Sequence, residues 1–179
     1  KFAELLGASK GKNFNPRIST HKVTDNTQII LIEPPCGSNT IIIKSNGNFL
    51  FIDSGYACYK EEMQNIFKRI IPDYERIKKV MLLTHADVDH CGLSPMFDEV
   101  ITSNKTAMCL INEYNGKNGY REENPLHKPY INICKLLTSY QCTNPDKITA
   151  MWGNTQKTTE PLTQIGFYDF EELHFEVYE

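Results

Sequence analysis

Two histidines and two aspartates lie within six residues of one another, in the segment Thr84-His85-Ala86-Asp87-Val88-Asp89-His90-Cys91-Gly92. An apolar run precedes the segment, so a rigid strand would fix the point from which these side chains project. Imidazole and carboxylate groups are ligands that zinc, iron and manganese accept. A bound divalent ion lowers the pKa of its water to about 7, which supplies hydroxide at neutral pH. The segment therefore indicates a catalytic metal site, and its candidate ligands are His85, Asp87, Asp89 and His90.

Composition alone also permits a plainer interpretation of the same segment. Aspartates are good helix N-caps, so these carboxylates could cap a short helix while the histidines lie in solvent. The two interpretations make different demands on the rest of the fold. A metal site needs elements that hold the loop in one place.

Such elements are predicted on the N-terminal side of the segment. Apolar β-branched runs at 28–33, 40–44 and 49–52 predict three antiparallel strands, and Asn46-Gly47 is a strong hairpin signal between the last two. Residues 59–71 have apolar side chains at helical spacing, and Pro72 ends that helix. The nearly all-apolar run 79–83 then predicts a strand buried on both faces, which leads directly into Thr84.

The C-terminal part is expected to continue with mixed elements. We predict a short helix at 93–97, a strand at 99–102 and a helix at 105–114. A further helix should run from Pro125 to about Tyr140, with buried positions at Ile131, Ile133, Leu136 and Leu137. Residues 148–152 and 173–177 suggest two more strands.

The ordering of the polar residues at 84–92 resembles the signature of the metallo-β-lactamase superfamily, Thr-His-x-His-x-Asp-His-x-Gly. The upstream Phe51-Ile52-Asp53-Ser54-Gly55 is similar to that family's strand-end aspartate motif. The resemblance covers about residues 27–103 well. It implies an α/β (α+β) fold of the metallo-β-lactamase type, an αββα sandwich of which this chain holds the first half. Residues 1–26 are expected to be an irregular arm, and 27–179 the N-terminal half of the domain.

The resemblance also implies roles for individual residues. His85 and Asp87 correspond to first-metal positions, and Asp89 and His90 to second-metal positions, with Asp89 also given a catalytic role. Asp53 corresponds to a residue that orients the loop by hydrogen bonds. Zinc is the expected metal, with iron or manganese as alternatives.

Two departures from the family pattern limit this transfer. Asp87 stands where the family has a second histidine, and a charged oxygen donor shifts metal preference toward iron or manganese. The distal ligands of the family are not visible downstream, where the histidines are His127 and His174. A half-sandwich would leave apolar surface uncovered, so we expect a homo-oligomer or a partner segment that completes the fold.

The function expected from these features is that of a metal-dependent hydrolase. A metal-bound hydroxide would attack a small-molecule ester or thioester. One alternative is a di-iron oxidoreductase on the same fold with a flavin-carrying partner, which a carboxylate-rich ligand set would suit. Another is a non-catalytic binding module with a degraded site.

Bulk composition restricts the partners. The 179 residues carry a net charge of -3, which gives no electrostatic footprint for nucleic acid. No apolar run approaches the roughly 18 to 20 residues that span a bilayer, so no membrane partner is expected. Six cysteines without a Cys-x-x-Cys pair fit a reducing compartment, and we expect a cytoplasmic protein that acts on a small molecule.

Overall fold

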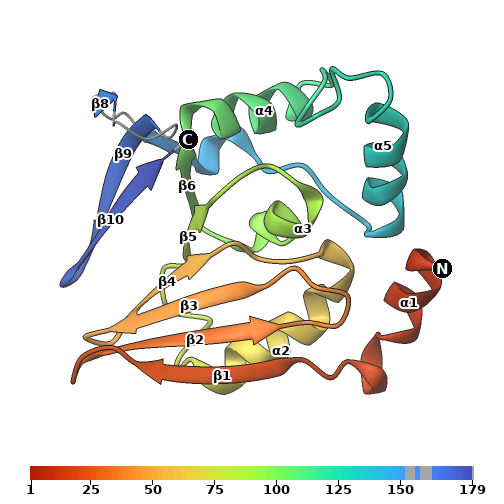
Figure 1. Ribbon diagram of the computed structural model, residues 1–179. Helices are drawn as coiled ribbons and strands as arrows, with labels where there is room; N and C mark the ends of the chain where they lie inside the picture. The colour runs from red at the N-terminus through yellow and green to blue at the C-terminus, as the bar shows by residue number, and fades with distance from the viewer. Residues whose placement is uncertain (152–155, 158–162, 179) are drawn as a thin grey trace.

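A mixed sheet forms the centre of the protein (Figure 1). The computed structural model describes residues 1–151, 156–157 and 163–178. Within these residues, seven strands follow one another across the sheet in chain order. They are β1 (Arg17–Lys22), β2 (Thr27–Glu33), β3 (Thr40–Ser45), β4 (Asn48–Ile52), β5 (Val80–Leu83), β6 (Glu99–Ser103) and β7 (Ile148–Met151). Strands β1 to β4 pair antiparallel, and β4 to β7 pair parallel.

The three antiparallel strands that the sequence predicts form as β2, β3 and β4. These strands alternate between the two faces, so that Ile30 and Ile42 face one core while Ile29 and Ile43 face the other. The β3–β4 turn places Asn46 at φ 49° and Gly47 at φ 87°, the left-handed conformations that a two-residue hairpin turn requires. This turn fixes the register that brings Asp53 to the end of β4.

Helices cover one face and the carboxyl ends of the parallel strands. They are α1 (Phe2–Ala8), α2 (Lys60–Ile70), α3 (Val88–Cys91), α4 (Asn104–Tyr114) and α5 (Lys128–Leu137), with 3₁₀ turns η1 (Gly11–Asn13), η2 (Ala57–Tyr59), η3 (Ser94–Met96) and η4 (Pro145–Lys147). Helix α2 buries Met63, Ile66 and Phe67 against the sheet, and the Phe67 ring lies 5.2 Å from that of Phe51 on β4. The predicted helix after β4 is therefore confirmed, and it holds β4 and β5 side by side.

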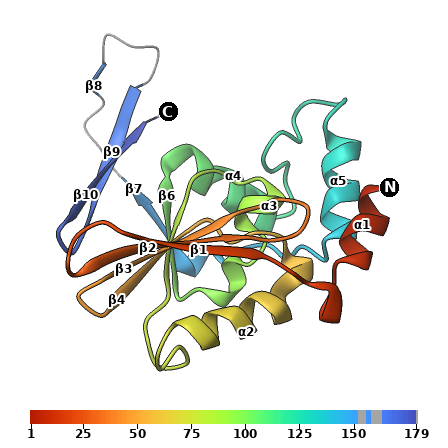
Figure 2. The same ribbon diagram turned by 60° about the horizontal axis from the view of Figure 1, so that its bottom comes forward.

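A hairpin covers part of the opposite face. It consists of β9 (Thr163–Phe170) and β10 (Leu173–Tyr178), with β8 (Gln156–Lys157) at its edge. In Figure 2, α2 lies below the strands and the hairpin rises above them. Phe170, Leu173 and Phe175 pack against the small core that contains Leu50 and Leu82. The predicted strand at 173–177 is confirmed, whereas Trp152, at the end of the predicted strand 148–152, lies outside the described residues.

The N-terminal residues are not an irregular arm as predicted. Residues 2–8 form α1, with Leu6 buried to 2% exposure, and residues 17–22 form β1. Strand β1 pairs with β2 from Arg17 to Lys22. The sequence pattern missed this strand because β1 is a half-exposed edge strand, whose order comes from backbone pairing with β2.

Helix α5 differs in part from the prediction. It begins at Lys128, with Pro129 in its first turn, where a proline is tolerated. Ile131 is buried as predicted, but Ile133, Leu136 and Leu137 are 55%, 80% and 37% exposed, because the helix packs through Ile131 and Cys134. Among the described residues, no helix is long and apolar enough to cross a membrane.

Candidate metal centre

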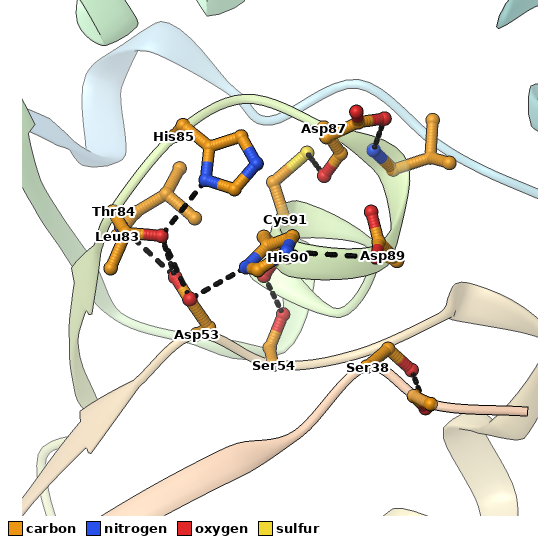
Figure 3. A network of polar contacts seen from close by, with 12 residues as sticks. Ser38, Asp53, Ser54, Leu83, Thr84, His85, Asp87, Asp89, His90 and Cys91 are labelled. Carbon is orange, nitrogen blue, oxygen red and sulfur yellow. Dashed lines mark hydrogen bonds and ion pairs between the residues drawn. The ribbon is translucent and has the colours of Figure 1, made fainter. Parts of the chain in front are cut away.

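The segment 84–92 forms a loop and one helical turn at the carboxyl end of β5, beside the end of β4 (Figure 3). Parallel strands present their following loops at the same edge of a sheet, which is where ligands bind in open α/β folds. Asp53 follows β4 and Thr84 follows β5. The two sequence motifs therefore meet at this edge, although 30 residues separate them.

Asp53 holds the loop through both carboxylate oxygens. Its Oδ1 accepts from the Thr84 amide at 2.9 Å, and its Oδ2 accepts from the Thr84 hydroxyl at 2.8 Å. His90 Nδ1 lies 2.7 Å from the same Oδ2. The backbone of Asp53 is left-handed at φ 55°, a conformation that costs energy and is kept where the surroundings enforce it. Asp53 thus makes the orienting hydrogen bonds that the resemblance implies.

The two motifs also contact each other through their backbones. The Ser54 amide and hydroxyl both donate to the His90 carbonyl, at 2.9 and 3.0 Å. A Cβ on Gly92 would lie 2.4 Å from the Gly55 carbonyl oxygen and 2.6 Å from the Ala57 amide nitrogen. Only glycine fits at position 92, which gives the last residue of the signature a steric reason.

His85 and His90 lie together at the open side of the loop. Their ring centroids are 4.0 Å apart. The Thr84 hydroxyl donates to Asp53, so it can accept from His85 Nδ1, which lies 3.0 Å away. Nδ1 of His85 then contacts Thr84, and Nδ1 of His90 contacts Asp53.

The two rings differ in the direction of their pKa shifts. Burial lowers the pKa of His85, and the neighbouring His90 lowers it further. Burial also opposes protonation of His90, but the hydrogen bond and charge of Asp53 outweigh it and raise the pKa of His90. His85 is therefore held in the neutral form that binds metals.

The aspartates occupy two different settings. Asp89 Oδ2 lies 3.6 Å from His90 Nε2, so a carboxylate and an imidazole are adjacent on the open side. Asp87 is the N-cap of α3, where Oδ1 accepts from the Val88 amide at 2.9 Å. Its Oδ2 lies 3.4 Å from Arg121 Nη1. The capping role belongs to the plainer interpretation of the sequence, but the histidines are fixed by hydrogen bonds and are not free in solvent.

The four predicted ligands therefore lie on one loop, but they do not form one cluster. Across the described residues, no group of three or more His, Cys, Asp or Glu side chains is arranged to hold a metal ion. The donor types fit a divalent cation: the His85 and His90 rings are adjacent, and the Asp89 carboxylate lies 3.6 Å from His90 Nε2. The fourth, Asp87, faces the Arg121 guanidinium.

A buried polar network behind the loop escaped sequence reasoning. The Cys91 thiol is fully buried, donates to the Asp87 carbonyl and lies 3.6 Å from the Tyr140 hydroxyl, which donates to Glu113 at 2.7 Å. Burial raises the pKa of Cys91, so its thiol stays protonated and is a packing group, not a ligand. Cys91 and Tyr140 are 49 positions apart, which leaves no local motif to detect.

The remaining histidines belong to other elements. His174 lies on β10, where Nδ1 contacts Asp169 of the same hairpin at 2.5 Å, and His21 lies on the edge strand β1. His127 immediately precedes α5. Tyr120 contacts His85 edge to face, with the ring centroids 5.5 Å apart. Tyr114 and Tyr130 are largely exposed.

Comparison with known proteins shows the fold of the metallo-β-lactamases, as the signature predicts. The Rm3 metallo-β-lactamase is 14% identical, with a TM-score of 0.52 over 92% of this chain and 54% of that protein. A metallo-β-lactamase from Pontibacter korlensis is 21% identical, with a TM-score of 0.37 over 57% and 50%. A mutant flavo di-iron protein from Thermotoga maritima is 22% identical, with a TM-score of 0.44 over 58% and 31%.

The chain thus spans about half of the length of the metallo-β-lactamases it matches. No known family profile matches the sequence, and no curated protein matches it.

Proposed function

We propose that this chain, which has the metallo-β-lactamase fold, carries the metal-binding loop of a metal-dependent hydrolase for small-molecule esters or thioesters. One observation carries the proposal: Thr84 and Asp53 engage Nδ1 of His85 and of His90, which leaves Nε2 of each ring available to bind an ion. In metal sites, a carboxylate typically accepts a hydrogen bond from the ring nitrogen of a histidine that does not bind the ion, and so orients the ring. A purely structural loop has no need of this arrangement.

The residues would have the following roles. His85, Asp89 and His90 would hold the ion, with Asp87 as the fourth ligand. A divalent ion there would supply a water of lowered pKa and would stabilise negative charge that develops on the substrate. Asp53 would hold His90 in its ligand orientation, and Asp89 would in addition orient the attacking water. We infer that zinc is the preferred ion, and that iron and manganese are the alternatives because Asp87 adds a carboxylate donor to the ligand set.

Hydrolysis by the zinc-loaded protein tests this function. We expect the wild-type protein to hydrolyse an activated ester and a small thioester, and His90→Ala to lose about 100-fold or more in kcat/KM. His174→Ala removes a histidine from the hairpin and serves as the matched control, with unchanged activity. Equal rates in wild type and His90→Ala would contradict the proposal.

A di-iron redox function is the second candidate, because Asp87 makes the ligand set richer in carboxylates than the family signature. It predicts two equivalents of iron and an absorption change on reduction. Zinc-dependent hydrolysis without iron excludes it.

A further inference from the structure

Both carboxylate oxygens of Asp87 contact other residues of the protein. Oδ1 caps α3 through the Val88 amide, and Oδ2 pairs with Arg121 at 3.4 Å. The Asp87 side chain is 19% exposed and that of Arg121 is 45% exposed, so the pair lies at the margin of the site. A cation that binds Asp87 Oδ2 therefore competes with this guanidinium for the same oxygen.

The position of Arg121 beside Asp87 is fixed by its backbone conformation and by its two neighbours in the sequence. Its backbone is left-handed at φ 62°, a conformation that is unfavourable for a side chain of this size. The preceding Tyr120 packs against His85, and the following Glu122 is buried to 7% exposure. Two neighbours therefore anchor Arg121 on either side.

Glu122 is the stronger of these anchors. It accepts from the Gly119 amide at 2.6 Å and from Lys135 Nζ of α5 at 2.7 Å, and Lys135 also pairs with Glu113 of α4. A Cβ on Gly119 would lie 3.1 Å from the Glu113 Cβ, so the turn is packed against α4. We call Glu113, Glu122 and Lys135 the α4–α5 clamp. Because Glu122 directly follows Arg121, the clamp holds Arg121 beside the metal loop.

The charge of Arg121 has two effects on the loop. It offsets the electrostatic repulsion between the neighbouring carboxylates of Asp87 and Asp89. It also opposes the approach of a divalent cation to Asp87, because the guanidinium and the ion compete for the same oxygen.

We propose that Arg121 competes with the metal ion for the Asp87 carboxylate and thereby sets the metal affinity of the site. The inference rests on the proposed metal-binding function. It adds a residue outside the signature that determines how tightly the ion is held. Release of Arg121 from Asp87 accompanies loading of the ion.

Metal titration of the purified protein tests the competition. Zinc is titrated against a chromogenic chelator with wild type and Arg121→Gln, and we expect Arg121→Gln to bind zinc about three- to tenfold more tightly. Lys117→Gln removes the same charge from an exposed position four residues earlier and should change the affinity by less than about twofold.

A double-mutant cycle separates direct competition from general repulsion. Asp87→Asn keeps the cap of α3, since asparagine caps as well as aspartate, but it removes the charge for which Arg121 competes. In the Asp87→Asn background, Arg121→Gln should change the zinc affinity no more than Lys117→Gln does.

Unchanged or weaker zinc binding by Arg121→Gln overturns the inference while the proposed function stands. An undiminished effect of Arg121→Gln in the Asp87→Asn background also overturns it, because the effect would then be general repulsion. Absence of zinc binding in all variants overturns the inference and the proposed function together.

Discussion

Asp53 is the residue on which the geometry of the loop depends most. Its carboxylate receives hydrogen bonds from Thr84 and His90, and its side chain is 10% exposed. Asp53 orients His90 but does not itself bind the ion. Its loss should therefore weaken metal binding although the candidate ligand residues are still present.

Asp53→Ala is therefore expected to lower zinc affinity about 10- to 100-fold. It should also lower the free energy of unfolding by about 1 to 3 kcal/mol, because buried donors lose their acceptor. Chelator competition and urea unfolding measure the two effects. Asp25→Ala, at an exposed turn, is the control, and equal zinc affinity in both variants would count against the role of Asp53.

Gly92 tests the contact between the two motifs. A methyl group there meets the Gly55 and Ala57 backbone, which cannot move without displacing Asp53. We expect Gly92→Ala to destabilise the protein by about 3 kcal/mol or more. Gly7→Ala in α1 adds a methyl group with nothing within 4 Å and should be neutral or slightly stabilising in the same thermal unfolding measurement. Similar melting temperatures for the two variants would show that the backbone approach is not as close as described.

Among the helices, α4 and α5 matter through the α4–α5 clamp. Lys135 is 20% exposed and its partners Glu113 and Glu122 are 10% and 7% exposed, so removal of the lysine leaves two carboxylates buried without a cation. Lys135→Met should cost about 3 to 5 kcal/mol of unfolding free energy at neutral pH. Urea unfolding measures this loss.

The ion pairs of the α4–α5 clamp also predict how the difference in unfolding free energy between wild type and Lys135→Met varies with pH. Burial tends to raise the pKa of Glu122, but the hydrogen bonds from Lys135 and Gly119 outweigh it and hold the pKa below its ordinary value of 4.5. A depressed carboxyl pKa contributes stability above the unfolded value, and the contribution is lost as pH falls through the folded value. The gap in unfolding free energy between wild type and Lys135→Met should therefore narrow below about pH 4.5. A gap that is constant from pH 7 to pH 3 would contradict the ion pairing.

Local patterns predicted most of the elements around the loop. The apolar alternation of β2 to β4, the turn at Asn46-Gly47 and the amphipathic α2 are all encoded within short windows of sequence. Strand β1 and the exposed face of α5 were predicted wrongly because pairing and packing with distant residues decide them. The same reason explains why Arg121 and the α4–α5 clamp were missed: their partners are 13 to 34 positions away.

In the molecule as a whole, the β9–β10 hairpin decides how much apolar surface is exposed. Its turn is tied to the sheet by Glu171, which accepts from Asn48, and by Glu172, which accepts from Thr24 and Thr27. Phe175 packs against the core that contains Leu50. The sequence-based expectation of a homo-oligomer or partner segment concerns this same face and stays a prediction.

Phe175→Ala should loosen the hairpin and uncover the apolar face. We expect a loss of about 1 to 2 kcal/mol in unfolding free energy, less than for a fully buried phenylalanine, and increased self-association. Sedimentation velocity at several concentrations detects the second effect. Phe167→Ala, which removes a side chain that is 59% exposed, should change neither property. Identical sedimentation of the two variants would show that the hairpin does not protect this face.

The most direct test of the central claim is the metal content of the purified protein. Elemental analysis of wild type should find a stoichiometric divalent metal, which disappears in the Asp89→Ala, His90→Ala double variant. Zinc or manganese would agree with hydrolysis, and two equivalents of iron with the redox candidate. No stoichiometric metal in wild type, or the same content in both proteins, would contradict a metal centre at this loop.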